Sequence, residues 1–244
     1  MATKEKRVLL FLVEGISDKV SLQSIFEDYF DSKKVQISVM RYDITQEEFP
    51  AEIKSKMNQI IQGFCSIEKI KVGDIKKVIH IVDTDGAFVN QEHVLQNDGT
   101  SKTSYSEEFI NAKKRESIIQ RNNNKASVLN ILSKISTITV TSGTTNIAVP
   151  YSIYYFSRNL EHVLHNIIGN LTDQQKEDYS NNFDDEYEGD SKKFKSFISN
   201  TEFAVPGNYK NTWDFIKQDT NSLKRFSNIH LIFEDCNQRG RSAT

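Results

Sequence analysis

Two short apolar runs, each followed at once by acidic residues and a glycine, constrain the fold of this chain most strongly. Residues 7–13 are RVLLFLV and are followed by Glu14, and residues 77–82 are KVIHIV and are followed by Asp83. An apolar run without polar alternation is typical of a strand buried on both faces, as in a parallel sheet covered by helices. The two runs therefore predict internal strands of a parallel sheet.

The segments between these runs alternate in the order that such a sheet requires. Apolar residues at helical spacing follow the first strand up to about residue 30, and a second strand is predicted over 35–42. A second helix is predicted over 47–64, with a break near Gly63. Strand, helix, strand, helix, strand indicates an α/β fold with right-handed crossovers.

The middle of the chain predicts an insertion and then a return to regular structure. Residues 88–125 are polar without a clear period and predict a long loop or small insertion. Helical spacing returns over 127–135, and 137–150 predict a short hairpin. Residues 151–156 predict another strand, and a helix is expected over 159–168.

The last third of the chain changes character. Residues 172–212 are rich in Asp, Glu, Asn, Ser and Lys, which predicts a polar lobe. After it, 213–226 predict a helix and 228–235 a strand-like segment. Residues 166–244 are therefore expected to form a largely helical C-terminal extension.

Composition and charge narrow the classes of partner and compartment. Only 37% of residues are hydrophobic, and the net charge of −2 gives no global basic field. Binding a polyanion would then depend on local patches or on metal ions. Cys65 and Cys236 are far apart and form neither a disulfide framework nor a metal cluster, which suits a reducing cytoplasm. We expect a cytoplasmic protein, since the sequence shows neither a signal peptide nor a membrane span.

Acidic residues follow the predicted strands at the places where ligands bind in open parallel sheets. Glu14 follows the first run, Asp83 and Asp85 follow the third strand, and Glu161 lies shortly after the strand at 151–156. Asp83 and Asp85 would face one side on an extended segment. Clustered carboxylates repel one another unless a cation neutralises them, and an all-oxygen set favours Mg²⁺ or Mn²⁺. We predict Glu14, Asp83 and Asp85 as metal ligands, with Glu14 also open to a role as general base.

Each acid alone has a structural explanation as well. Asp18 caps or faces the same turn as Glu14, and both roles are open. Glu161 is either a ligand to a second metal ion or a first-turn acid that suits the helix dipole. The combination of Glu-Gly after one apolar strand and Asp-x-Asp-Gly after another is harder to explain by turns alone.

At these residues the sequence resembles the TOPRIM domain of topoisomerases, DnaG-type primases, recombination proteins and OLD-family nucleases. The resemblance covers about residues 5–165 and depends on VEG with Glu14 and VDTDG with Asp83 and Asp85. It implies a TOPRIM-like Rossmannoid parallel sheet flanked by helices. The VEGISD form and SRNLEHVL, with Glu161, are most similar to TOPRIM nucleases of phage defence.

This finer resemblance implies a toxic effector of an abortive-infection system of the AbiL or PARIS type. Such an effector cuts nucleic acid, DNA or RNA and possibly tRNA, with Mg²⁺ or Mn²⁺, beside an ABC-type or OLD-type ATPase. The chain has no Gly-x-x-x-x-Gly-Lys-Ser/Thr phosphate loop, so the ATPase is expected to be a separate protein. A primase-like nucleotidyl transferase and a non-catalytic regulatory subunit are the alternatives, and a homo-oligomer is compatible with the sequence.

Basic, histidine and tryptophan side chains supply weaker candidates. The residues considered for backbone contact with nucleic acid are Lys113, Lys114, Arg115, Arg121, Lys125, Lys224 and Arg225. A solvated face is the alternative for such a run. His80, His162 and His165 are interpreted as structural, and Trp213 as a packing anchor.

Overall fold

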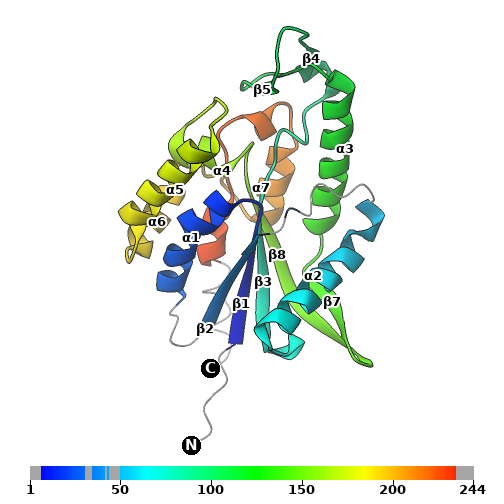
Figure 1. Cartoon of the computed structure of the whole chain (residues 1–244), viewed down its shortest axis with the longest axis vertical. Coiled ribbons are helices and arrows are strands. Elements are labelled where there is room, and N and C mark those ends of the chain that lie inside the picture. The colour runs from blue at the N-terminus through cyan, green and yellow to red at the C-terminus, as the bar shows by residue number, and fades with distance from the viewer. Residues whose placement is uncertain (1–6, 31–34, 42, 44–49, 235–244) are drawn as a thin grey trace, which may run out of the picture.

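A mostly parallel five-stranded sheet forms the centre of the described protein (Figure 1). The computed structural model describes residues 7–30, 35–41, 43 and 50–234. The strands run in the order β2-β1-β3-β8-β7, and the first four are parallel. The bounds are β1 Arg7–Val13, β2 Val35–Arg41, β3 Ile75–Asp83, β7 Thr137–Ser142 and β8 Thr145–Phe156. The predicted α/β class, with a sheet flanked by helices, is therefore confirmed, although the sheet is mixed because β7 pairs antiparallel with β8.

The apolar runs form central strands because their side chains fill two cores at once. Successive side chains of a strand point to opposite faces of the sheet. In β1, Val8, Leu10 and Leu12 enter one core, whereas Leu9 and Phe11 enter the other. All of these side chains are at most 3% exposed.

Helices cover both faces of this sheet (Figure 1). The helices on one face are α2 (Ile53–Glu68), α3 (Arg115–Leu132) and α7 (Tyr209–Ile216). The helices on the other are α1 (Ile16–Tyr29), α4 (Leu160–His165), α5 (Asp173–Tyr187) and α6 (Ser191–Ile198). The result is a three-layer arrangement with the carboxyl ends of the parallel strands at one edge.

Three predicted boundaries are wrong in the middle of the chain. Helix α2 continues through Gly63, whose position lies in open space and tolerates the helix. Helix α3 begins at Arg115, inside the stretch predicted as an insertion. The sequence prediction missed its first turns because polar residues interrupt the apolar stripe of the helix. Strand β8 continues through Pro150, so the predicted hairpin and the following strand share one long strand.

The insertion after β3 forms a small second sheet. It contains β4 (Val94–Gln96), β5 (Ser104–Tyr105) and β6 (Ile110–Ala112), which form a three-stranded sheet. Val94 and Ile110 join a small apolar cluster with Leu223 from the C-terminal third. This cluster attaches the insertion to the rest of the protein.

The segment predicted as a polar lobe consists largely of helices. Phe183 and Tyr187 of α5 and Phe194 of α6 are buried against the sheet, so a sparse apolar face is enough to order these polar helices. The strand predicted over 228–235 is wrong as far as residue 234. Ile229–Leu231 forms a 3-10 turn, and its apolar side chains pack into the core on the α1 side of the sheet.

Some predictions lie outside the described residues. These concern residue 42 of the second strand, the start of the second helix at 47–49, residue 235 and Cys236. Among the residues that the structure describes, no helix combines the length and apolar character needed to cross a membrane.

Candidate active site

The acidic residues lie where the order of the strands reverses. From β1 the chain continues to β2 on one side, while β3 pairs with β1 on the other side. At such a switch point the loops leave in opposite directions and open a crevice at the carboxyl ends of the strands. Glu14 directly follows β1, and Asp83 is the last residue of β3.

The turn after β3 places Asp85 in a conformation that the sequence did not predict. Asp85 has a φ of 49°, so the Asp83–Asp85 segment is not extended and the expected strand alternation does not apply. The Asp85 amide donates to the carbonyl of Arg158 at 2.9 Å, and Arg121 donates to the Asp85 carbonyl at 3.0 Å. Gly86 follows with a φ of 73°, which favours glycine. The turn, rather than the pleat of the strand, aims the second aspartate.

A buried lysine connects the acids of the two strands. The ammonium group of Lys125, in α3, donates to Asp85 Oδ2 at 2.5 Å and to Glu14 Oε2 at 3.2 Å. The Lys125 side chain is only 4% exposed. Two carboxylates from separate strands therefore converge on one cationic group.

A second lysine forms an ion pair with an acid of the site on the α1 side of the sheet. Lys176 of α5 forms an ion pair with Glu161 of α4, with 3.0 Å between Nζ and Oε1. Asp18 of α1 is buried, and its charge and that of Glu161 influence each other. The structure thus brings Asp18 and Glu161 into one network with the acids that follow β1 and β3.

Three of these carboxyl groups hold their protons more tightly than usual. Burial, opposed by Lys125 and reinforced by neighbouring acids, raises the pKa of Glu14 to about 8. Burial also raises the pKa of Asp18 to about 6, with repulsion from Glu161 adding to it. The pKa of Asp83 lies well above its ordinary value because of burial and the charges of Asp18, Glu14 and Asp85.

Asp85 and Lys125 shift in the direction that keeps both charged. Burial alone would raise the pKa of Asp85, but the charges of Lys125 and Arg121 outweigh it, so the pKa is lowered. Burial would lower the pKa of Lys125, but Asp85, Glu14 and Asp83 outweigh it and raise the pKa. These two residues form the ionised pair of the site.

Two of the acids also have structural roles. Asp83 accepts a hydrogen bond from the Leu160 amide at 3.1 Å, at the start of α4. Asp18 accepts one from the Gly15 amide at 2.8 Å, which is the capping contact of the two roles left open for it. Gly15 itself has a φ of −107°, so its turn does not need the conformational freedom of glycine. Both carboxyl groups nevertheless belong to the charged network described above.

A divalent ion suits this site in donor type and charge. Glu14 and Asp85 contact the ammonium group of Lys125, Glu161 contacts that of Lys176, and Asp18 and Asp83 interact with this network through their charges. Negative charge exceeds positive charge among these side chains, and oxygen-only donors are those that Mg²⁺ prefers. Within the described residues, no group of three or more His, Cys, Asp or Glu side chains is arranged to hold one ion. Three of the acids instead form ion pairs with the two lysines.

Lys176 lines two pockets. One, of about 500 Å³, lies between α1 and α5 and includes Gly15, Ile16 and Arg41 in its lining. A smaller one includes Asn159 and Glu161. Volumes of this order hold small ligands or parts of larger ones. Of the five acids, Glu161 therefore borders space that a substrate can enter.

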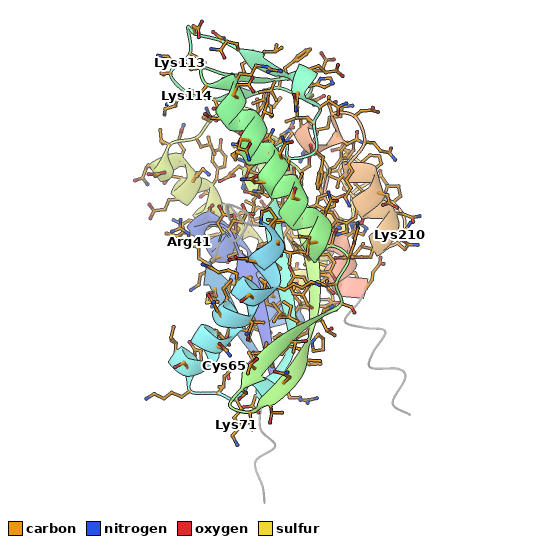
Figure 2. The ribbon with its side chains drawn as sticks, turned by 90° about the vertical axis from the view of Figure 1, so that its right-hand side faces the viewer. Arg41, Cys65, Lys71, Lys113, Lys114 and Lys210 are labelled. Atoms are coloured by element: carbon orange, nitrogen blue, oxygen red, sulfur yellow. The ribbon has the colours of Figure 1, made fainter. Side chains whose placement is uncertain are left out.

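The predicted nucleic-acid contacts divide into exposed and structural residues. Lys113 and Lys114 are exposed, next to each other at the end of α3 that adjoins the small sheet (Figure 2). Arg115 instead donates to the carbonyls of Val94 and Gln91, and it holds the insertion together. Lys224 and Arg225, the remaining two candidates, lie in the C-terminal third.

Lys224 is half-buried, and Arg225 serves the C-terminal packing. Arg225 donates to the Val163 carbonyl at 2.9 Å and lies over the Phe203 ring. These contacts explain its presence without nucleic acid. Lys113 and Lys114 are therefore the better placed of the predicted basic contacts.

The histidines and the tryptophan have packing roles. His80 is buried and makes a 2.9 Å hydrogen bond with the Tyr151 hydroxyl. His162 is 1% exposed, and burial together with two arginines lowers its pKa to about 4. His165 packs between aromatic rings of α5. Trp213 is buried against Tyr155.

The sequence did not assign Lys125 and Lys176 to this site. Residues 88–125 show no clear period, so the sequence predicts Lys125 only as part of a basic run that faces solvent or contacts nucleic acid. Its position three residues after Asn122 and four before Leu129 is the helical spacing of a buried stripe, which was a usable signal. Lys176 lies in a polar segment, and nothing in its neighbourhood distinguishes it from a surface residue.

Comparison with protein-family models, curated proteins and solved structures gave no match to this chain. Functional inference therefore depends on the site itself.

Proposed function

We propose that this chain is a divalent-metal-dependent nuclease with a TOPRIM-like site. The observation that supports it best is the convergence of Glu14, Asp83 and Asp85 at the switch point between β1 and β3. Mg²⁺ or Mn²⁺, when bound, would stabilise the negative charge that develops on the scissile phosphate. Glu14, Asp83 and Asp85 are the proposed ligands, with Asp18 and Glu161 as candidates for a second ion.

The residues of the chain would divide the remaining work. In hydrolysis, a water oxygen forms a bond to phosphorus, the ester P–O bond breaks, and the water gives up a proton. Where Glu14 is not a metal ligand, it is the proposed general base that accepts that proton. Lys176 borders both pockets and offers an ammonium group to the phosphate backbone.

The proposed biological role is that of a toxic effector in anti-phage defence, working with a separate ABC-type ATPase. This role depends on the resemblance of VEGISD and VDTDG to TOPRIM nucleases. It predicts that expression of the chain alone slows growth and fragments cellular nucleic acid. It also predicts that co-expression with the ATPase restrains this toxicity.

The decisive experiment compares cleavage by wild type, Glu14→Gln, Asp85→Asn and the exposed control Glu107→Gln. Labelled single-stranded DNA, duplex DNA, RNA and tRNA are incubated with each protein in Mg²⁺, Mn²⁺ or EDTA. We expect metal-dependent cleavage of at least one substrate, reduced roughly 100-fold or more in the two site variants and unchanged in the control.

Two other outcomes would overturn this proposal. Incorporation of labelled nucleotides into longer chains would identify a nucleotidyl transferase of the primase kind. Absence of both metal binding and cleavage, with full tolerance of the two site variants in cells, would identify a non-catalytic regulatory subunit.

A further inference from the structure

Lys125 lies in the buried face of α3 and not on the solvent side. Asn122, Val128 and Leu129 share this face, and Lys125 is 3% exposed among them. Asn122 also donates to the Gly86 carbonyl at 3.2 Å, which ties α3 to the turn after β3. The helix therefore delivers the Lys125 ammonium to one fixed place.

That place is between the two strands that supply the acids. Its ammonium group contacts Asp85 at 2.5 Å and Glu14 at 3.2 Å. A buried ammonium group is stable only with such partners, and Asp85, the nearer of the two acids, gains most from it. The three side chains depend on one another, although they come from separate segments of the chain.

We infer that the Lys125 ammonium group is a resident counter-ion, which holds the acidic site together without metal and competes with a divalent cation for Glu14 and Asp85. This inference depends on the proposed metal-dependent function. Mg²⁺ needs carboxylate oxygens at about 2.0–2.1 Å. A dication that close to these oxygens repels the ammonium group, so binding must move the Lys125 side chain.

The anchoring of α3 confines this movement to the side chain. Val128, Leu129 and Leu132 are fully buried in the core beneath the helix. The flexible four-carbon chain of Lys125 can change rotamer while the helix stays in place. Metal loading thus exchanges one cation for another with little change in the fold.

The test measures Mn²⁺ affinity by isothermal titration calorimetry for wild type, Lys125→Met, Lys125→Arg and the exposed control Lys113→Met. Removal of the competing charge should tighten Mn²⁺ binding by about tenfold or more in Lys125→Met. The Arg variant, which keeps the charge, and the Lys113 control should bind like wild type. Equal or weaker binding by Lys125→Met would overturn the inference while leaving the nuclease proposal intact.

Failure of every protein to bind Mn²⁺ would instead overturn both this inference and the metal-dependent function. A measurement on the wild type avoids any folding defect of the variants. Acetic anhydride should label Lys125 slowly in metal-free protein and faster after Mn²⁺ is added, as quantified by mass spectrometry. Lys113 should be labelled at the same rate in both conditions, and unchanged labelling of Lys125 on metal addition would contradict the exchange of cations.

Discussion

Glu14 and Lys125 are the residues whose chemistry depends most on their surroundings. Burial raises the pKa of Glu14 to about 8, although the Lys125 ammonium opposes this shift. Asp85 gains more from the same ammonium group, and its pKa is lowered. Two carboxyl groups that contact one lysine thus differ in charge state at neutral pH, because burial dominates one and ion pairing the other.

The raised pKa of Glu14 predicts that metal-free protein loses stability as pH rises. In the unfolded chain Glu14 releases its proton near pH 4.5, whereas the folded protein retains it up to about pH 8. Between these pH values the folded state binds the extra proton, so the free energy of unfolding falls as pH rises. The raised pKa of Asp18, about 6, acts in the same direction.

Urea unfolding in EDTA at several values between pH 5 and pH 8 measures this dependence. Glu14→Gln should show a shallower decline than wild type, since the amide does not titrate. The exposed control Glu107→Gln should decline like wild type. An unchanged slope in Glu14→Gln would show that Glu14 is not the titrating group.

At the scale of elements, the turn after β3 determines how the acids meet. Its backbone is hydrogen-bonded to the end of β8 and to the segment that follows: the Thr84 amide donates to the Phe156 carbonyl and the Asp85 amide to the Arg158 carbonyl. Gly86 then adopts positive φ beneath Leu223. The turn is therefore held by segments far away in sequence.

Gly86→Ala is expected to destabilise the protein by about 1–3 kcal/mol. A Cβ at this position would lie 2.7 Å from Leu223 Cδ2 and 2.9 Å from Ile110 Cδ1, on a backbone that disfavours alanine. Gly63→Ala is the matched control, because nothing lies within 4 Å of its Cβ and its helical position should gain about 0.5–1 kcal/mol. Opposite signs in chemical denaturation confirm this prediction, and equal effects contradict it.

At the scale of the whole molecule, the C-terminal third contributes to both faces of the sheet. Trp213 and Ile216 of α7 enter the core on the α2 side, whereas Phe194 and Phe233 enter the core on the α1 side. Phe233 contacts the rings of Phe26 and Tyr29 in α1, the helix that carries Asp18. The C-terminal residues therefore hold α1 in place, although they lie far in sequence from the strands that the site acids follow.

Phe233→Ala should cost about 3–5 kcal/mol of unfolding free energy, as large cavities in cores do. Ile67→Ala, at a position 76% exposed, should change stability by no more than about 0.5 kcal/mol. Unfolding followed by Trp213 fluorescence and by far-UV circular dichroism should coincide in both variants, since the two faces share one sheet. Separate transitions would show that the C-terminal residues unfold independently.

The sequence alone determined the central strands and the identity of the acids. Arg7–Val13 and Ile75–Asp83 are recognisable because a strand buried on both faces needs apolar side chains at every position. Acids directly after such strands must lie at one edge of a parallel sheet. This local information was enough to place Glu14 and Asp83 together.

Only the tertiary structure decided what surrounds those acids. Lys125 and Lys176 come from helices so rich in polar residues that the sequence does not reveal which face is buried. The direction of Asp85 is set by a turn that is hydrogen-bonded to the segment after β8. Whether a lysine faces water or a carboxylate depends on which elements pack together, and that packing involves residues far apart in the chain. Charge states, pockets and cation contacts therefore follow from the packing, whereas strand positions follow from the residues themselves.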